Sequence, residues 1–404
     1  MTPASIGGAA DGASARPRRL ALPDEIIEIA AALEGAGHET WCVGGSVRDA
    51  VMDGPRDDID LATAATPDQV QALFPRTVPV GLKFGTVGVL DRHRQLHEVT
   101  TFRRDVTTDG RHAEVVFART IDEDLGRRDF TMNAIAYHPL RQVWRDPFGG
   151  AADIAAGVVR AVGVARERFQ EDYLRILRAL RFAARFDFRI DPETWQAAID
   201  GIDGLRRLSA ERVRDEWYRT LETARSVRRA VRLWQDVGAA AVCLPGLRDD
   251  YPLAADDPSP RDPVLLTTLL VRQAGRLLDR LKASRAEIDR SLRIERGPAE
   301  PHDTSPVRVR RWLAQVEPAA DDLLAAHRLR TGTEAPWAPV VAGIRERGEA
   351  TVRSQLAVTG DDLRSAGIPP GPDLGRILGL LMDEVIEDPA RNQRDRLLAR
   401  ALEL

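Results

Sequence analysis

The chain is 404 residues long and carries 58 Lys and Arg against 62 Asp and Glu, which gives a formal net charge of −4. This balance excludes a polybasic, histone-like protein, and 43% apolar with 30% charged residues argues against global disorder. The only two cysteines, Cys42 and Cys243, exclude a disulfide framework and a cysteine-rich zinc site. At about 150 residues per domain, the length predicts two to three domains.

Arginine supplies nearly all of the positive charge, since Lys83 and Lys282 are the only lysines. A GC-rich genome explains such a bias, but arginine also provides planar, permanently charged forks that suit phosphates and base edges. No apolar run approaches the roughly 18 residues needed to span a bilayer, and residues 1–20 lack the apolar core of a signal peptide. We therefore expect a cytoplasmic protein without membrane association, and a disordered N-terminal tail over residues 1–20.

Residues 21–150 alternate short apolar runs with short amphipathic stretches, which predicts a mixed α/β domain. Pro23 and Asp24 begin a predicted helix that Gly35 and Gly37 end. Further predicted elements are strands at 41–43, 59–62 and 115–117, a hairpin of 85–90 with 97–102, and helices at 46–52 and 66–74.

Beyond Gly150 helical patterns replace the strand signals. The predicted helices are 166–185, 192–199, 210–224, 227–237, 307–316 and 321–327, followed by a terminal helical unit at 359–404. Proline-rich stretches at 249–263 and 297–306 predict loops or linkers between these helices.

A pair of carboxylates, Asp58 and Asp60, lies on the second predicted strand. Because side chains alternate along a strand, both carboxylates are expected to point to the same face. Two carboxylates at that spacing can hold Mg²⁺ ions, which prefer oxygen ligands and bridging phosphates. A DxD pair alone is often only surface acid.

The glycine pair Gly44 and Gly45 precedes these carboxylates, between a predicted strand and a predicted helix. Bare backbone N–H groups at such a turn can approach a triphosphate, toward which Arg48 would also point. Two glycines alone are more often a plain turn. The combination of strand, glycine pair, helix and DxD strand is much more specific than either part.

Two further segments are rich in arginine. Arg127 and Arg128 precede an apolar stretch, so that one could bind phosphate while the other pairs with a carboxylate; a salt-bridged helix start explains them as well. In the second segment Asp172, Arg175, Arg178 and Arg181 recur every three residues and predict a polar stripe along one helix. Such a stripe is usually a solvent-exposed helix face whose charged side chains pair with one another.

The local charge favours a functional role for this stripe. Residues 160–232 hold 17 arginines and 12 acidic residues, a local charge of +5, so that the rest of the chain carries −9. A positive helical segment beside a metal and phosphate site is where a polyanion is expected to bind.

These segments resemble the tRNA nucleotidyltransferase and poly(A) polymerase family, specifically its class II, bacterial-type CCA-adding branch. The matching segments are GGSVRD (44–49) with DDID (57–60), RRDFTMNAIA (127–136), DPFGG (146–150) with Asp153, Arg160 and Gly163, EDYLRILRALRF (171–182), SAER (209–212) with Glu216, VTGDDL (358–363) and GPDLG (371–375). They follow one another in the family's order over residues 22–225 and 356–400.

The resemblance implies an α+β fold with a polymerase-β-like nucleotidyltransferase head that contains a small mixed sheet, followed by an all-α neck, body and tail in a seahorse-shaped arrangement. The implied domains are a catalytic head at 21–150, a nucleotide-reading, RNA-binding neck at 151–225, a body at 226–350 and a tRNA-binding tail at 351–404. The implied activity is template-independent, Mg²⁺-dependent addition of C, C and A to the 3′ end of tRNA from CTP and ATP. No obligate protein partner is expected.

The resemblance also implies roles for individual residues. Asp58 and Asp60 would bind the metal and carry catalysis, with Glu98 as a candidate third carboxylate. The implied nucleotide-binding residues are Gly44, Gly45, Arg48, Arg128, Asp172, Arg175, Arg178 and Arg181.

Base selection has a physical basis in these residue types. The Watson–Crick edges of C and A each offer a ring acceptor and an amino donor, whereas U and G present a ring N–H instead. One arginine that donates and one aspartate that accepts therefore satisfy C and A but not U or G. We hypothesise that Asp172 and Arg175 perform this reading.

Alternatives to full CCA addition remain open at this point. Residues 105–115 lack the Tyr and Pro usual in the family's flexible loop, which helps to admit the final A. CC-only addition, A-only addition and poly(A) synthesis would use the same predicted site, and they remain alternatives to full CCA addition. A non-catalytic RNA-binding protein would have no reason to retain Asp58, Asp60 and Arg128, and a generic Mg²⁺ nucleotidyltransferase does not explain the neck and tail matches.

Overall fold

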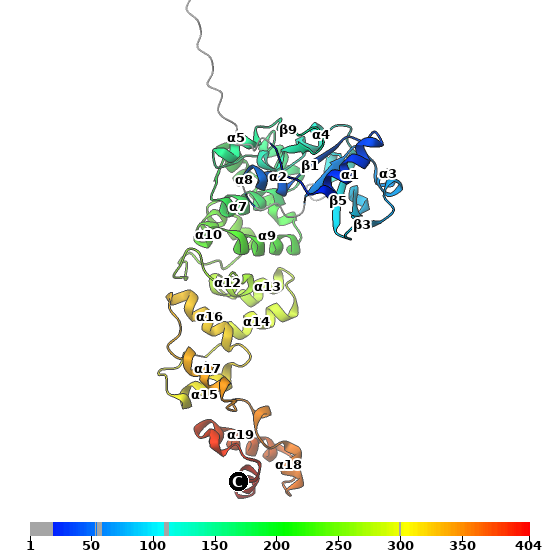
Figure 1. Cartoon of the computed structure of the whole chain (residues 1–404). Coiled ribbons are helices and arrows are strands. Elements are labelled where there is room, and N and C mark those ends of the chain that lie inside the picture. The colour runs from blue at the N-terminus through cyan, green and yellow to red at the C-terminus, as the bar shows by residue number, and fades with distance from the viewer. Residues whose placement is uncertain (1–18, 53, 55–58, 109–112, 299) are drawn as a thin grey trace, which may run out of the picture. The chain divides into compact units, whose positions relative to one another are not determined.

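The structure, a computed structural model, describes residues 19–52, 54, 59–108, 113–298 and 300–404. The chain divides into two compact units, Met1–Pro245 and Gly246–Leu404, and many of their elements are labelled in Figure 1. Several predictions fall wholly or partly outside the described residues: the tail over residues 1–18, the metal ligand Asp58, residues 109–112 of the segment 105–115, and residue 299 of the linker 297–306. The finer division into neck, body and tail remains a prediction.

The first unit contains a seven-stranded mixed sheet with the strand order β3-β4-β5-β2-β1-β8-β9. Its strands are β1 (Thr40–Val43), β2 (Asp60–Thr63), β3 (Thr77–Gly81), β4 (Thr86–Leu90), β5 (Leu96–Thr101), β8 (Ala136–His138) and β9 (Val143–Arg145). Strands β2 and β5 pair in parallel, and the other paired strands of this sheet are antiparallel. Two small sheets join β6 (Arg103–Thr108) to β7 (Ala113–Phe117) and β10 (Val158–Val159) to β11 (Arg189–Ile190).

The helices of this unit are α1 (Asp24–Gly35), α2 (Gly45–Val51), α3 (Pro67–Leu73), α4 (Ile121–Gly126), α5 (Gly150–Ala155), α6 (Ala165–Glu171), α7 (Leu174–Phe186), α8 (Pro192–Asp200), α9 (Ala210–Thr223), α10 (Val227–Asp236) and α11 (Ala239–Cys243). Local sequence explains several of their ends. The side chain of Thr66, for example, accepts a hydrogen bond from the backbone N–H of Gln69, whose own side chain accepts from Thr66, so that a capping box begins α3.

Most predicted elements of the first unit are confirmed. The strands predicted at 41–43, 59–62, 85–90 and 97–102 are β1, β2, β4 and β5 with small shifts at their ends, and the predicted hairpin is the β4–β5 pair. The strand predicted at 115–117 is β7, which lies outside the main sheet. The strands that were not predicted are β3, β6, β8, β9, β10 and β11; β8 to β11 are too short to show an alternation, and β3 is an edge strand that contains Pro79. The parallel pair β10–β11 also shows that the expectation of an all-α segment at 151–225 is wrong.

One prediction about helices is wrong. The segment 166–185 was expected to be a single helix, but the structure has α6 and α7 separated by Asp172 and Tyr173. The backbone of Asp172 is extended, with φ −153° and ψ 105°, and its Oδ1 accepts a hydrogen bond from the backbone N–H of Leu174 at 3.0 Å. An aspartate side chain that bonds the backbone in this way competes with the helix, and the interruption follows.

Helix α7 positions the polar stripe because its opposite side is part of the core. Ile176, Leu177 and Leu180 are fully buried, and α7 packs against α9. Behind it, the rings of Trp217 and Trp234 meet edge to face with their centroids 5.2 Å apart. The arginines of α7 are therefore held on a fixed helix face.

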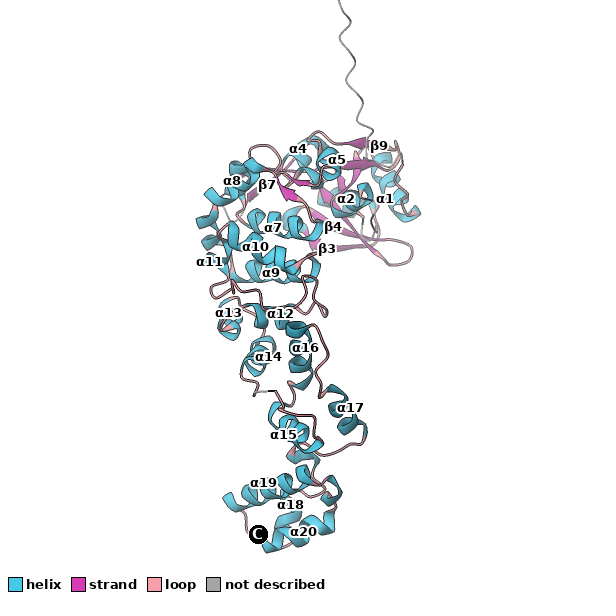
Figure 2. Cartoon of the chain, turned by 90° about the vertical axis from the view of Figure 1, so that its left-hand side faces the viewer, coloured by secondary structure: helices cyan, strands magenta, loops and turns pink. Residues whose placement is uncertain are grey.

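The second unit consists of helices joined by loops. They are α12 (Pro263–Leu270), α13 (Ala274–Arg280), α14 (Arg285–Glu295), α15 (Pro306–Val316), α16 (Ala320–Thr331), α17 (Ala338–Glu346), α18 (Gly360–Ser365), α19 (Pro372–Glu387) and α20 (Arg394–Glu403). The predicted helices at 307–316 and 321–327 and the terminal helical unit are confirmed as α15, α16 and α18 to α20. In the described part of the chain the strands shown in Figure 2 all belong to the first unit.

The apolar clusters among the described residues of this unit include one around Val309, Trp312 and Ile344 and one around Leu363, Leu381 and Val385. No helix within the described ranges is long and apolar enough to pass through a lipid bilayer.

Candidate active site

A cavity of about 610 Å³ in the first unit brings the predicted site residues together. Its lining includes Gly44, Gly45, Arg48, Asp60, Glu98, Arg128, Asp172, Arg175, Arg178 and Arg181. Asp58, the remaining predicted residue, lies outside the described residues. Among the described lining residues are nine arginines and five carboxylates, so that the cavity has the positive excess that a polyanionic ligand requires.

Asp60 and Glu98 lie on neighbouring strands of the sheet. The parallel pairing of β2 with β5 places Leu61 opposite Val99, and Asp60 and Glu98 each come one residue earlier. Side chains at equivalent positions of paired strands share a face, and both carboxylates line the cavity. Within the described residues no group of three His, Cys, Asp or Glu side chains is close enough to hold a metal ion. The two carboxylates offer the hard oxygen donors that Mg²⁺ prefers.

Gly44 leaves space beside the Asp60 carboxylate. It connects β1 to α2 with φ +86°, a conformation that side chains with a Cβ rarely adopt. A Cβ at this position would lie 3.0 Å from Oδ2 of Asp60. The backbone can therefore approach this carboxylate closely only because residue 44 is a glycine.

Arg48 on α2 is held by protein groups on several sides. Its Nε donates to Oδ1 of Asp49 at 2.7 Å and its Nη1 to Oδ1 of Asn133 at 2.9 Å. The guanidinium also lies over the ring of Phe186, 4.9 Å from its centroid. The side chain is only 5% exposed, and this burial lowers the pKa of Arg48 despite the neighbouring Asp49. Arg48 lines the cavity from a fixed position.

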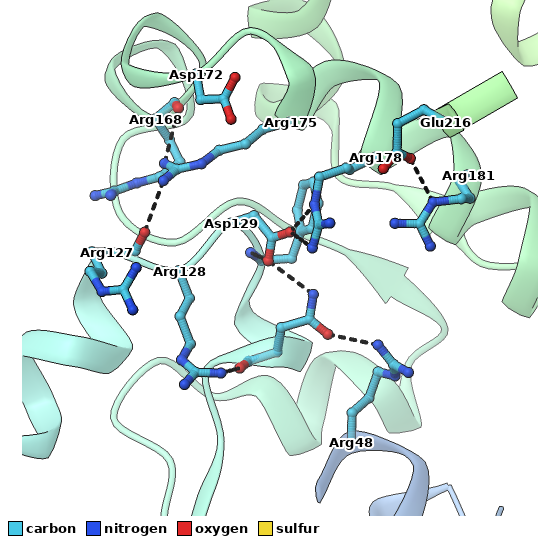
Figure 3. Close-up of polar contacts among 12 residues, drawn as sticks. Arg48, Arg127, Arg128, Asp129, Arg168, Asp172, Arg175, Arg178, Arg181 and Glu216 are labelled. Carbon is cyan, nitrogen blue, oxygen red and sulfur yellow. Dashed lines mark hydrogen bonds and ion pairs between the residues drawn. The ribbon is translucent and has the colours of Figure 1, made fainter. Parts of the chain in front are cut away.

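Asp129 joins this arrangement to helix α7. Arg178 donates to its Oδ2 at 2.7 Å, and Nδ2 of Asn133 donates to its Oδ1 at 2.9 Å (Figure 3). Burial alone would raise the pKa of Asp129, but the charge of Arg178 and the hydrogen bonds from Asn133 and Arg178 outweigh it and lower the pKa to about 2. A continuous series of contacts thus runs from Arg48 through Asn133 and Asp129 to Arg178.

Both arginines of the Arg127-Arg128 pair bind the buried carboxylate of Asp124. Nη2 of Arg127 lies 2.9 Å from Oδ1, and Nη2 of Arg128 lies 3.0 Å from Oδ2. Arg128 also donates to the backbone carbonyl of Asn133 at 3.2 Å. Asp124 presents one oxygen to each arginine, so that the predicted carboxylate pairing involves both of them, and a phosphate-binding role for one of them stays a prediction. The idea of a helix start is wrong, because the pair follows the end of α4.

The predicted base-reading residues are both partnered by protein groups. Oδ2 of Asp172 accepts from Nη2 of Arg212 at 2.7 Å. Nη1 of Arg175 donates to Oε2 of Glu171 at 2.6 Å, and its Nη2 donates to the backbone carbonyl of Arg127 at 3.1 Å. Figure 3 shows Asp172 and Arg175 near one another on one side of the group.

Arg181 is the most enclosed arginine of the predicted stripe. Its Nε donates to Oε2 of Glu216 at 2.6 Å, and the two side chains are 8% and 4% exposed. Burial lowers the pKa of Arg181, and the Glu216 carboxylate opposes this. Its guanidinium also lies over the ring of Phe182, 4.3 Å from the centroid.

Sequence reasoning missed several lining residues: Asp124, Asp129, Asn133, Arg185 and Arg212. Most of them lie within or beside the quoted motifs, so a signal was available in their position. The sequence carries no signal for which residues they contact, because Asp129 is 49 residues from Arg178, and Asp172 is 40 residues from Arg212.

Comparison with known proteins gives consistent results along the chain. Residues 40–160 match the poly(A) polymerase head domain, and residues 187–250 match the family described as the probable RNA and SrmB-binding site of polymerase A. The CCA-adding enzyme of Levilactobacillus brevis is 35% identical over 402 residues, covering 94% of this chain and 98% of the relative. That of Geobacillus stearothermophilus is 33% identical, covering 94% and 96%.

Solved structures agree. The crystal structure of the Bacillus stearothermophilus CCA-adding enzyme in complex with CTP has a TM-score of 0.79 at 32% identity, covering 94% of this chain and 96% of that one. The Thermotoga maritima CCA-adding enzyme complexed with tRNA has a TM-score of 0.65 at 18% identity, a likeness that concerns the fold alone. The head with its mixed sheet and the helical remainder are therefore those of a polymerase-β-like nucleotidyltransferase.

Proposed function

This chain belongs to the family of CCA-adding enzymes, which are tRNA nucleotidyltransferases, and we propose that its arginine-lined cavity binds CTP and ATP and adds C, C and A to the 3′ end of tRNA. The observation that carries this proposal is the meeting of Asp60 and Glu98 with nine arginines in one cavity of about 610 Å³. Carboxylates beside a cationic wall suit a reaction between a triphosphate and a hydroxyl group.

The transfer forms one bond and breaks another. The 3′ oxygen of the tRNA attacks the α-phosphorus of the nucleotide, its proton leaves, and the bond to the pyrophosphate breaks in line with the attack. No covalent enzyme intermediate is required. The chain's own contribution is to hold both reactants in line and to offset the negative charge of the departing pyrophosphate.

Mg²⁺ is the proposed metal, with Asp58 and Asp60 as its ligands and Glu98 as a candidate third. When bound, it would favour loss of the proton from the 3′ hydroxyl and stabilise the pyrophosphate charge. Gly44 supports this assignment, because the space beside Oδ2 of Asp60 would be filled by a Cβ. The oxygen donors of Asp60 and Glu98 also fit a hard cation.

Triphosphate binding is assigned to Gly44, Gly45 and Arg48, together with Arg128, Arg178 and Arg181. Each of these arginines already has a hydrogen-bond acceptor in the protein. Such partners keep the guanidinium groups in place before a ligand arrives, which reduces the entropy lost on binding. A guanidinium has five N–H donors, so that one protein partner does not use all of its capacity.

Base selection is assigned to Asp172 and Arg175. A carboxylate accepts through two oxygens with about four lone-pair sites, so that Asp172 can hold Arg212 and still accept from the amino group of C or A. Arg175 would donate to the ring nitrogen of the same base. U and G would place a ring N–H against this donor and lose the hydrogen bond.

The decisive experiment offers the purified protein tRNAs that lack CCA, CA or only the final A, with each nucleotide alone and with CTP and ATP together. Sequencing of the products is expected to show completion to CCA and then a stop. Extension that stops at CC would indicate a CC-adding enzyme, and a run of A residues would indicate a poly(A) polymerase. If no tRNA is extended at all, the protein would be a non-catalytic RNA-binding protein. Neither the site nor the relatives give support to these alternatives.

A further inference from the structure

A second cavity, of about 350 Å³, lies within the unit Gly246–Leu404. Helices α12, α14, α15 and α16 and the loops beside them contribute to its walls. Three arginines line it, Arg248, Arg272 and Arg330, together with the indole rings of Trp312 and Trp337. Neither the sequence motifs nor the proposed reaction uses any of these residues.

The carboxylates of this cavity are engaged within the protein. Glu295 accepts a hydrogen bond from the backbone N–H of Ala274 at 2.6 Å, and Glu300 accepts from Nδ1 of His327 at 2.9 Å. Among the arginines, Arg248 is paired with Asp250 at 2.9 Å. Each of these two carboxylates thus already has a partner in the protein.

Arg272 and Arg330 are different. Both side chains are exposed, and within the described ranges no hydrogen bond or ion pair joins either guanidinium to another residue. The hydrogen bond from Arg248 is the main reason that the pKa of Asp250 is lowered, and the charge of Arg272 adds a smaller effect without direct contact. Two cationic forks at the wall of one cavity are therefore available to a ligand.

The two indole groups of the wall are buried. Trp312 and Trp337 are each only 5% exposed, and their Nε1–H groups have no hydrogen-bond partner among the described residues. Buried polar groups in proteins nearly always have a partner. The donors of this wall that are open to a ligand are therefore the guanidinium groups of Arg272 and Arg330, and such groups recognise an anion rich in acceptors.

We propose that this cavity binds a phosphate group of the tRNA, held by Arg272 and Arg330. Arginine forks match the geometry of phosphate oxygens and form paired hydrogen bonds with them. The volume lies near the lower end of the range for ligand pockets, which suits one nucleotide unit. The inference rests on the proposed function for the identity of the RNA, because a polymerase must hold its substrate at points away from the reacting end.

A free nucleoside phosphate offers the same chemistry, and the experiment therefore has two arms. The full-length protein, the double variant Arg272→Ala/Arg330→Ala and the control Arg276→Ala/Arg285→Ala are compared. The control removes the same charge from two exposed arginines of the same unit that do not line the cavity. Circular dichroism and thermal melting establish that all three proteins are equally folded.

In the first arm, binding of a fluorescent tRNA that lacks CCA is measured at several salt concentrations. Loss of two phosphate contacts is expected to lower the affinity at least about tenfold near 0.1 M salt and to reduce the salt slope by about one per arginine. The control is expected to stay within about twofold of the wild type. An equal loss in both variants would be a general charge effect and would overturn the proposal.

In the second arm, equilibrium dialysis with labelled CTP counts the nucleotides bound by each chain in the absence of RNA. One CTP per chain in all three proteins, together with weaker tRNA binding by the double variant, supports RNA as the source of the phosphate. Loss of a second CTP in the double variant at unchanged tRNA affinity would assign the cavity to free nucleotides and overturn the RNA proposal. If neither the tRNA affinity nor the number of bound CTP molecules changes in the double variant, the proposed site is wrong.

Failure here is distinguishable from failure of the proposed function. Both arms measure binding and need no catalysis, whereas the proposed function is tested by extension of tRNA. A wild-type protein that extends tRNA to CCA with the same tRNA affinity as the double variant would contradict only this inference.

Discussion

Arg212 donates a hydrogen bond from Nη2 to Oδ2 of Asp172 at 2.7 Å and so joins the first turn of α9 to the break between α6 and α7. The other oxygen of Asp172 accepts from the backbone N–H of Leu174 at 3.0 Å. Both carboxylate oxygens are therefore fixed by groups of the protein. A carboxylate held in this way presents its remaining lone pairs in a set direction, as the base selection proposed for Asp172 requires.

The first prediction concerns this contact. Arg212→Ala is expected to loosen the carboxylate of Asp172 and to raise misincorporation of UTP and GTP relative to CTP, by roughly tenfold if one charge-assisted hydrogen bond is lost. Arg212→Lys retains the charge and is expected to recover part of the selectivity. Misincorporation is measured by sequencing the products made with each nucleotide alone.

Two further variants show how large the effect of Arg212→Ala on selectivity is. Asp172→Ala removes the acceptor itself and is expected to erode selectivity more than Arg212→Ala. Arg206, on the same unit and outside the cavity lining, provides a neutral control as Arg206→Ala. If Arg212→Ala lowers activity but leaves the ratio of U to C incorporation unchanged, Arg212 has only a structural role.

The second prediction concerns the carboxylates. Asp58→Ala and Asp60→Ala are each expected to lower incorporation at least about a thousandfold, because metal-assisted phosphoryl transfer depends on these ligands. Glu98→Ala is expected to have a smaller effect. Chelation of Mg²⁺ should abolish activity, and added Mg²⁺ should restore it in the wild type. A merely mild loss in Asp60→Ala at an unchanged Mg²⁺ requirement would refute the metal assignment.

The third prediction compares two neighbouring glycines. Gly44→Ala forces a Cβ to 3.0 Å from Oδ2 of Asp60 at φ +86°, whereas a Cβ at Gly45 would lie 3.4 Å from the movable Nη2 of Arg48. Gly44→Ala is expected to cost about 1–2 kcal/mol of unfolding free energy and most of the activity. Gly45→Ala should be much milder. Equal effects of the two variants, in urea unfolding and in tRNA extension, would contradict this account.

The fourth prediction concerns pH. The pKa of Asp129 is about 2 in the folded protein, below the unfolded value of about 3.9. Ionised Asp129 therefore stabilises the fold above that unfolded value, and its contribution is lost as the pH falls toward about 2. Asp129→Asn is expected to lower the unfolding free energy at pH 7 by about 2–4 kcal/mol, because Arg178 loses its buried partner.

The measurement is urea unfolding of both proteins at several pH values. The difference between wild type and Asp129→Asn is expected to shrink between about pH 4 and pH 2, since protonation removes in the wild type the charge that the variant already lacks. A difference that stays constant over this range would show that Asp129 acts through packing alone.

Much of the fold could be predicted from the sequence because its signals are local. The strands around Trp41 and Ile59, the hairpin partner at 97–102 and the helix after Thr66 have short-range patterns of burial or capping. The helix predicted across Asp172 was wrong, because a side-chain contact with the backbone of Leu174 outweighed the helical periodicity.

The sequence by itself was enough to propose most of the site residues, because each motif carries its own residue types and spacing. Every predicted site residue that the structure describes lines the same cavity. Only the tertiary structure decided how these residues are partnered. Strand pairing placed Asp60 beside Glu98, and the packing of α7 and α9 brought Arg212 to Asp172. Arg178 of α7 meets Asp129 in the segment that follows α4. Contacts between residues 40 or more positions apart depend on how elements pack, and no local pattern encodes that packing.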